Sequence, residues 1–94
     1  MSLTFEWDAK KDASNRRKHR VSFEEAATVF ADSRSLTVSD PDHSESEERF
    51  VQLGLSYRGN LLVIVHTERG DNIRIISARK ATKRERSQYG KVKG

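Results

Sequence analysis

The chain has 94 residues, of which 34% are hydrophobic and 34% charged, and it contains no cysteine. This length supports one domain over residues 1–94 with a single thin core, and the lack of cysteine excludes disulfide bonds, thiol nucleophiles and thiolate metal sites. Lys and Arg number 18 against 14 Asp and Glu, which gives a net charge of +4. No stretch resembles a membrane span or a secretion signal, so we expect a cytoplasmic protein.

The first third of the chain predicts a short strand and two helices. Residues 5–7 are rich in aromatic side chains and indicate an edge strand, after which Asp8 can cap a first helix that runs to about His19. This helix carries few apolar residues and should lie on the surface. A second helix over about residues 22–31 opens with a Ser-x-x-Glu capping box and has an apolar stripe that faces the core.

The rest of the chain predicts four strands joined as a meander, followed by a third helix. Apolar alternation or short apolar runs mark strands at residues 35–39, 49–57, 61–65 and 73–77, with turn-forming segments between them. A second capping box, Thr82 with Glu85, opens a helix through about Tyr89 that Gly90 should end. The order β-α-α-β-β-β-β-α predicts an α+β fold, in which a small antiparallel sheet carries the two N-terminal helices on one side.

The charges are segregated along the chain. Residues 10–20 contain six bases and one acid, and residues 66–94 contain nine bases and three acids, whereas residues 24–49 contain eight acids and two bases. If the fold brings the two basic segments together, they form a positive surface suited to a phosphate backbone. The alternative is that each charged run is only a solvated face.

Short motifs along nearly the whole chain resemble the BrnT family of ribonuclease toxins from bacterial toxin–antitoxin pairs. They are Phe5-Glu6-Trp7-Asp8, Lys18-His19, Val21 to Ala26, Val29-Phe30, Asp40 with His43, Glu48-Arg49, His66 to Gly70, Ile73 to Arg79, and Glu85 with Tyr89. The most distinctive is the stretch Ile73 to Arg79, which a helix follows. One departure is Arg20, because the family usually has glycine after the histidine of the first helix, where a left-handed helix end favours it.

The resemblance implies a RelE-like fold and a metal-independent endoribonuclease activity that stops translation without a cofactor. It also implies neutralisation by a BrnA-like antitoxin, whose ribbon-helix-helix domain would bring the complex to operator DNA, and it allows a toxin homodimer within that complex. Two other functions stay open from the charge pattern. The chain could be a non-catalytic nucleic-acid-binding module of a DNA-binding repressor complex, or a protein-interaction domain that meets an acidic partner.

Two arginines are the candidates for binding the reacting phosphate. RNA cleavage without a metal uses the ribose 2′-OH as nucleophile, so the protein must neutralise the phosphorane, and the arginine fork matches phosphate oxygens. Arg74 lies among isoleucines in the predicted last strand, and Arg79, just beyond it, could converge with Arg74 on one phosphate. The alternative for Arg74 is an ion pair across the sheet with an acid such as Glu48 or Glu85.

Three further residues are candidates for proton transfer. His19 can act as acid or base near neutral pH, although a histidine that caps the helix end is an equal alternative. Glu85 could be a base, or only the capping-box partner. Tyr89 could donate a proton or stack on a base. His66, by contrast, is expected to pack within the sheet and Trp7 within the core.

The remaining site predictions concern the RNA backbone and metals. Backbone contacts are predicted for Lys18, Arg69, Lys80, Lys83 and Arg86. The loop residues Asp40, Asp42, His43 and Glu45 carry oxygen and imidazole donors, but no glycine stands at the turn position of a calcium loop, so we predict no metal site and no catalytic role for His43.

Overall fold

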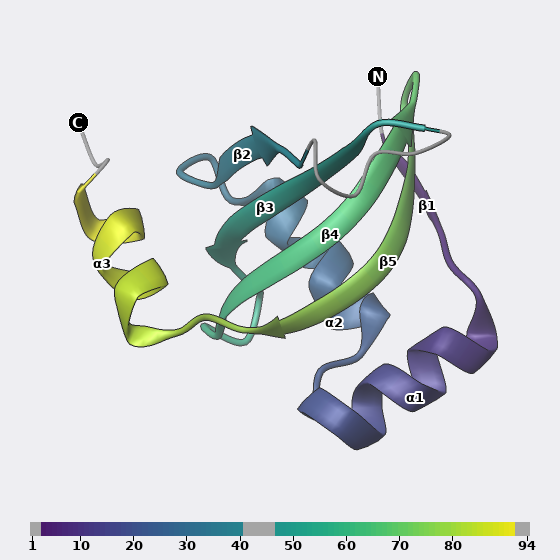
Figure 1. The fold of residues 1–94 in the computed structure, drawn as a ribbon, viewed down its shortest axis with the longest axis horizontal. Helices are drawn as coiled ribbons and strands as arrows, with labels where there is room; N and C mark the ends of the chain where they lie inside the picture. Colours follow the sequence, from purple (N-terminus) through teal and green to yellow (C-terminus); the bar gives the residue numbers. More distant parts are fainter. Residues whose placement is uncertain (1–2, 41–46, 92–94) are drawn as a thin grey trace.

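Five strands form one mixed sheet in the order β1–β5–β4–β3–β2 in the computed structural model, which describes residues 3–40 and 47–91 (Figure 1). The elements are β1 (Thr4–Glu6), α1 (Ala9–His19), α2 (Phe23–Ala27), the 3-10 helix η1 (Thr28–Ala31), β2 (Leu36–Ser39), β3 (Arg49–Leu55), β4 (Leu61–Arg69), β5 (Asn72–Lys80) and α3 (Lys83–Lys91). The predicted α+β class and element order are confirmed.

The direction of the first strand differs from the prediction. Strands β2 to β5 form the expected antiparallel meander, but β1 lies beside β5 and runs parallel to it, with Phe5 opposite Ile73. The helices α1 and α2 separate β1 from the other strands, so no hairpin turn sets its direction. The sheet is therefore mixed and has β1 and β2 at its edges.

The helices follow the capping residues, with two differences from the prediction. The second helix is α-helical only through Ala27 and continues as the 3-10 helix η1, and α3 runs past Gly90 to Lys91. Gly90 is not among the glycines with positive φ, so it does not adopt the left-handed conformation that ends a helix. None of the helices in the described ranges is long and apolar enough to cross a membrane.

Each face of the sheet carries its own apolar cluster, so the expectation of a single core is wrong. Alternation along β4 places Leu62 and Ile64 in the larger cluster, under α2 and η1, and Leu61 and Val63 in the smaller one, beneath α3. The larger cluster is Val21, Phe23, Ala26, Val29, Leu62, Ile64, Ile73, Ile75 and Ala78, with Trp7 packed against it as predicted. The segments α2 and η1 thus cover one face of the sheet, and α3 covers the opposite face.

A bulge in β5 decides which residues of this strand face α3. Val65 lies opposite Ser77 and His66 lies opposite Ile75, so Ile76 is an extra residue in β5. Because of this insertion, Ile75 and Ala78 both point into the larger cluster. Arg74 and Arg79 therefore share the opposite face although five positions separate them.

Asn15 joins α1 to the outer edge of β5. Strand β1 covers this edge only from Asn72 to Arg74. Farther along, the Asn15 amide donates to the carbonyl of Ala78 at 2.8 Å and accepts from the Ala78 N–H at 3.2 Å, and it also donates to the carbonyl of Val21 at 2.9 Å. Asn15 is only 7% exposed, so it serves these backbone groups in place of a neighbouring strand.

Removal of this amide should destabilise the protein. The change Asn15→Ala leaves the N–H and carbonyl of Ala78 and the carbonyl of Val21 without partners, which should lower the free energy of unfolding by about 2–4 kcal/mol. Urea unfolding monitored by circular dichroism measures the loss. The exposed neighbour Ser14 offers a matched control, since Ser14→Ala should have little effect; equal losses for both variants would contradict the role of Asn15.

The helix α1 ends in a left-handed residue. Arg20 has φ 59° and ψ 31°, and its N–H bonds the carbonyl of Arg16 at 2.9 Å. This is the conformation that favours glycine, and the left-handed helix end forms here with an arginine. A side chain in this region costs about 1–2 kcal/mol of backbone strain.

The change Arg20→Gly should therefore stabilise the fold by up to about 1 kcal/mol, because the relieved strain is partly offset by the greater freedom of glycine in the unfolded chain. Thermal unfolding of the variant measures this gain. Arg20→Ala removes the charge but keeps the Cβ, so it should give no such gain. A stabilisation of equal size in both variants would point to the charge rather than to the backbone.

Candidate functional site

Arg79 and Glu85 form a two-point ion pair between β5 and α3. The Nη1 and Nη2 atoms of Arg79 each donate to one carboxylate oxygen of Glu85 at 2.9 Å, and Nη1 also contacts the carbonyl of Lys80 at 3.3 Å. Glu85 in turn accepts from the N–H of Thr82 at 2.8 Å, while its own N–H donates to the Thr82 hydroxyl at 3.2 Å. The predicted capping box is thus confirmed, and its glutamate also holds the arginine.

This pair keeps Glu85 ionised and leaves Arg79 accessible. Hydrogen bonds from Arg79, together with those from Thr82, lower the pKa of Glu85 to about 2, and the same pair raises the pKa of Arg79. The Arg79 side chain is 41% exposed. Three of its N–H groups are used in these bonds, so the Nε–H and one N–H of Nη2 are left for another acceptor such as a phosphate oxygen. Glu85 positions the guanidinium, and a carboxylate of such low pKa is a weak base.

Tyr89 anchors the far end of α3. Its hydroxyl donates to the carboxylate of Asp32 at 2.7 Å, which raises the pKa of Tyr89, and its ring packs against the smaller apolar cluster. Burial by itself raises the pKa of Asp32, but hydrogen bonds from the Leu55 N–H and from Tyr89 outweigh it, and the net pKa is lowered. In this arrangement the Tyr89 hydroxyl has a structural partner.

Arg74 does not converge with Arg79. It donates to Glu6 at 2.8 Å, and Glu6 also accepts from Asn72 at 2.8 Å; these two bonds lower the pKa of Glu6. An extended strand advances by about 3.3 Å per residue, so Arg74 and Arg79 are on the order of 15 Å apart along β5. The prediction that Arg74 and Arg79 bind one phosphate together is therefore wrong. The acid that pairs with Arg74 is Glu6 rather than Glu48 or Glu85.

His19 and Arg79 do not share a pocket either. His19 ends α1, one turn after Asn15, and α1 lies along the outer edge of β5 (Figure 1). Arg79 follows Ala78 on β5 but projects from the face beneath α3, where Glu85 meets it. The two residues thus lie near the same end of β5, on different sides of the sheet.

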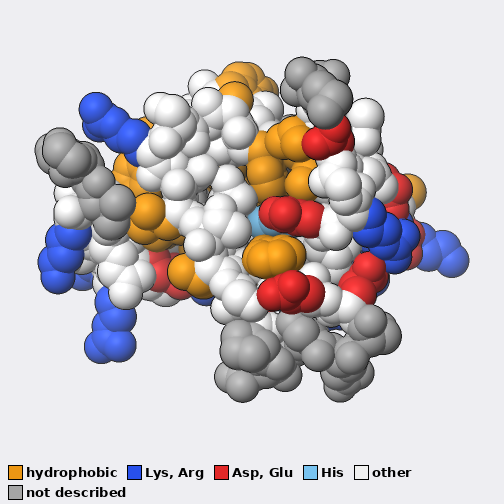
Figure 2. All heavy atoms as spheres, turned by 90° about the horizontal axis from the view of Figure 1, so that it is seen from above, with side chains coloured by type: hydrophobic (Ala, Val, Ile, Leu, Met, Phe, Trp, Pro, Cys, Tyr) orange, Lys and Arg blue, Asp and Glu red, His pale blue; other side chains and the backbone are white. Residues whose placement is uncertain are grey.

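The two ends of the sheet carry opposite charge. At one end lie the C-terminus of α1, the β3–β4 turn, the end of β5 and the start of α3, which contribute the bases Lys18, Arg20, Arg58, Lys80, Lys83 and Arg84 beside the acids Glu24 and Glu25; we call this the basic end. The other end carries the acids Glu6, Asp40, Glu47, Glu48, Glu68 and Asp71 beside the bases Arg49, Arg69 and Arg74. Figure 2 looks onto this acidic end, where red carboxylate side chains gather beside hydrophobic ones and blue Lys and Arg lie toward the two sides. The C-terminal part of the first basic segment and residues 80–84 of the second therefore meet at one end.

The predicted backbone-binding residues divide between these two ends. Lys18, Lys80 and Lys83 are exposed at the basic end, and Arg86 is exposed on α3. Arg69 instead pairs with Glu47 at 3.0 and 3.1 Å near the acidic end, an interaction that raises the pKa of Arg69.

The described part of the chain offers no metal-binding cluster. It contains no group of three or more His, Cys, Asp or Glu that could hold a metal ion. Asp42, His43 and Glu45 lie outside the described residues. His66 is fully buried, as predicted, with its Nε2 2.9 Å from Glu68 and its ring against Phe30 and Phe50.

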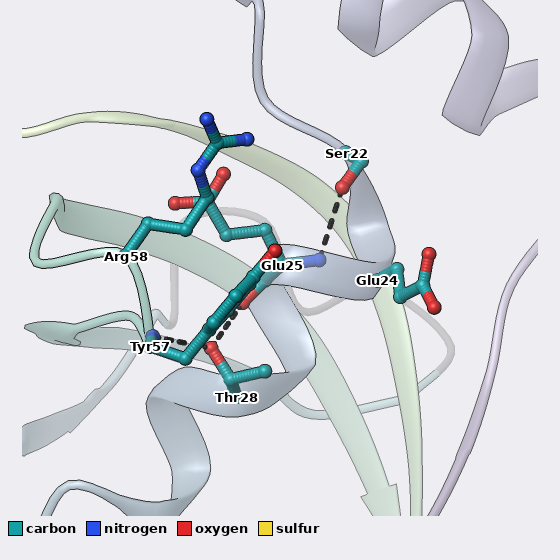
Figure 3. A pocket seen from close by; sticks show the side chains of 6 residues that line it. All are labelled: Ser22, Glu24, Glu25, Thr28, Tyr57 and Arg58. Atoms are coloured by element: carbon teal, nitrogen blue, oxygen red, sulfur yellow. Dashed lines mark hydrogen bonds between the residues drawn. The ribbon is translucent and has the colours of Figure 1, made fainter.

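The β3–β4 turn at the basic end was not predicted as part of a site. A pocket of about 330 Å³ lies between this turn and the start of α2, lined by Ser22, Glu24, Glu25, Thr28, Tyr57 and Arg58. Figure 3 shows Tyr57 and Arg58 leaving the turn, Glu25 reaching toward it from α2, and Glu24 pointing away. The sequence marked this segment only as a turn, although an aromatic beside an arginine at a turn tip was a usable signal.

The Arg79–Glu85 pair makes a pH-dependent contribution to stability. Because the pKa of Glu85 is lowered from 4.5 to about 2 on folding, its contribution is complete above pH 4.5 and is lost as the pH falls toward 2. Glu85→Gln keeps a capping-box side chain but removes the charge, and should cost about 1 kcal/mol at neutral pH, since the pair is partly exposed. Urea unfolding at pH 7 and near pH 2 should show this difference shrinking; a constant difference would contradict the ion pair.

Comparison with known proteins places the chain in a family. The model of the family described as the ribonuclease toxin BrnT of type II toxin–antitoxin systems matches residues 7–85. Among solved structures, the 1.1 Å crystal structure of the Brucella abortus ribonuclease toxin BrnT matches with a TM-score of 0.62 and 18% sequence identity, over 87% of this chain and 100% of that one. No curated protein matches the chain. The family match spans most of the sequence, and the chain belongs to the BrnT family of ribonuclease toxins of type II toxin–antitoxin systems.

Proposed function

We propose that this protein is a metal-independent endoribonuclease that arrests translation, with Arg79 as the group that binds the reacting phosphate. The observation that carries the proposal is the geometry of Arg79, which is held at two points by Glu85 while two of its N–H groups face no acceptor among the described residues. A guanidinium fixed in this way is pre-organised for the charge that develops on a phosphorane. Membership in a ribonuclease toxin family supports the same reaction class.

The proposed reaction needs no co-reactant beyond the RNA and water. The ribose 2′-oxygen loses its proton to water and bonds to the adjacent phosphorus, and the bond from phosphorus to the 5′-oxygen of the next nucleotide then breaks. The leaving oxygen takes up a proton from water, and the products carry a 2′,3′-cyclic phosphate and a 5′-hydroxyl. Arg79 stabilises the negative charge on the non-bridging oxygens, and Lys80 and Lys83 hold the flanking phosphates.

Proton transfer is assigned to water in this proposal, because His19 and Arg79 lie on different sides of the sheet and the other two candidates are engaged elsewhere. Glu85 is engaged by Arg79 and Thr82, and the Tyr89 hydroxyl is engaged by Asp32. The described residues show no side-chain hydrogen bond to His19, which is partly exposed where α1 reaches the basic end. An RNA strand that crosses this end of the sheet can contact both the edge and the α3 face of β5.

The test of the activity is cleavage of RNA by the purified protein in excess EDTA. We expect fragments that end in 2′,3′-cyclic phosphates, and growth arrest on expression without the antitoxin. Cleavage only after addition of Mg²⁺ would overturn metal independence. RNA that is bound in a salt-sensitive way but stays intact would instead identify a non-catalytic nucleic-acid-binding module.

Substitutions of the ion pair separate catalysis from stability. Arg79→Ala should lower the cleavage rate at least a hundredfold, on the order of the loss of one charge-stabilising donor. Glu85→Gln breaks the same ion pair but retains the arginine, so it should keep much more activity than Arg79→Ala at a similar loss of stability. Initial rates and urea unfolding of both variants provide the comparison, and Arg74→Ala is the control for an arginine on the same face. Equal rate losses for Arg79→Ala and Glu85→Gln would make Arg79 a structural residue.

The antitoxin partner is proposed to be BrnA-like and to carry a ribbon-helix-helix domain. This domain would bring the toxin–antitoxin complex to operator DNA. The toxin can pair as a homodimer within that complex. Family membership implies an antitoxin. Beside Arg79, an apolar groove of about 110 Å³ lies between the sheet and α3, lined by Leu36, Val38, Val51, Leu53, Val63, Glu85 and Gln88. The exposed bases Lys83 and Arg86 on α3 make this region complementary to a segment with apolar and acidic side chains, which would also cover Arg79.

A further inference from the structure

An aromatic side chain stands almost free at the basic end. Tyr57, at the β3–β4 turn, is 74% exposed, more than any other large hydrophobic side chain among the described residues. No hydrogen bond to its hydroxyl is found there; only its backbone N–H is engaged, by the Thr28 hydroxyl at 2.9 Å. Arg58 beside it is also exposed. The Tyr57 ring therefore adds little buried apolar area to the core. A role in folding does not explain why an aromatic residue stands at this position.

A buried glutamate holds this turn rigid. Glu25 is 6% exposed and accepts hydrogen bonds from Ser56 at 2.6 Å and from Asn60 at 2.9 Å, on the two sides of the turn. The Ser56 hydroxyl also accepts from the N–H groups of Arg58 and Asn60 at 3.2 and 3.3 Å. A buried carboxylate is costly unless it is bonded in this way. The whole network fixes the backbone that carries Tyr57.

The turn also lies where a nucleic acid strand would pass. The chain enters β4 at Leu61, whose carbonyl accepts from the Ala81 N–H at 2.9 Å, immediately after β5 ends at Lys80. On the other side, the pocket beside Tyr57 reaches Ser22, two residues after Arg20. An exposed ring is thus placed between the basic ends of α1 and β5.

We propose that Tyr57 is a stacking platform for an unpaired RNA base, with Arg58 on the adjacent phosphate or on the second face of that base. Single-stranded RNA is held by aromatic rings that stack on splayed bases, combined with cations along the backbone. A ring on a rigid turn loses little conformational freedom on binding. The proposal rests on RNA being the substrate and names a contact outside the reacting phosphate at Arg79.

The test uses an oligonucleotide that the protein cannot cleave. A single-stranded 2′-O-methyl RNA has no nucleophilic 2′-OH, and an abasic strand of equal length carries the same phosphate charge without bases. With the full-length protein, Tyr57→Ala should weaken binding of the base-bearing strand about tenfold, the range expected for one stacked base, and should leave binding of the abasic strand unchanged. Tyr57→Phe, which keeps the ring, should bind as the wild type does.

The controls separate stacking from folding and from antitoxin binding. Leu3→Ala removes another exposed apolar side chain, next to β1, and should change neither affinity; thermal unfolding should be equal for all three variants. Equal weakening of both strands by Tyr57→Ala, or no weakening of either, would overturn the proposal, and so would a loss of antitoxin affinity with unchanged oligonucleotide binding. Because the probe cannot be cleaved, its binding can be measured even if the protein shows no ribonuclease activity. Failure of the stacking proposal is therefore distinguishable from failure of the proposed activity.

Discussion

The side-chain amide of Asn15 forms the hydrogen bonds to β5 that a neighbouring strand would otherwise form. The arrangement of the basic end depends on these bonds. Strand β1 stops at Glu6, so the backbone of β5 near Ala78 would face the helical layer without partners. The amide presents one acceptor and one donor to Ala78, as a strand would, and reaches Val21 as well. Helix α1, the residues that follow it and β5 are thereby fixed together, and this brings the basic C-terminus of α1 and the basic end of β5 to one end of the sheet.

Features encoded by neighbouring residues could be predicted from the sequence. The Thr82 and Glu85 capping box forms in full, since both halves lie within one turn of helix. In the other box, Ser22 caps the N–H of Glu25, but the carboxylate turns away to Ser56 and Asn60. The difference comes from a turn more than thirty residues away, which offers a buried carboxylate two donors, and no local pattern reveals it.

The parts that escaped prediction depend on contacts between distant segments. Simple alternation places Arg74 and Arg79 on opposite faces, and only the bulge at Ile76 puts them on one. The hydrogen bond from Tyr89 to Asp32 spans 57 positions, so no local pattern in the sequence reveals that the hydroxyl has a structural partner. The capping box alone explains a glutamate at position 85, so the sequence does not reveal that Glu85 also holds Arg79. This contact forms because β5 continues to Lys80 and so includes Arg79.

The separation of charge between the two ends of the sheet makes the molecule an electric dipole. In the field of a polyanion, such a body feels a torque as well as an attraction, so that it turns its cationic pole forward before contact. At physiological ionic strength this field decays within about 8 Å, less than the size of the protein, and the turning is confined to the final approach. Orientation is therefore selected during the encounter, and productive collisions with a polyanionic partner become more frequent without any additional contact in the bound state.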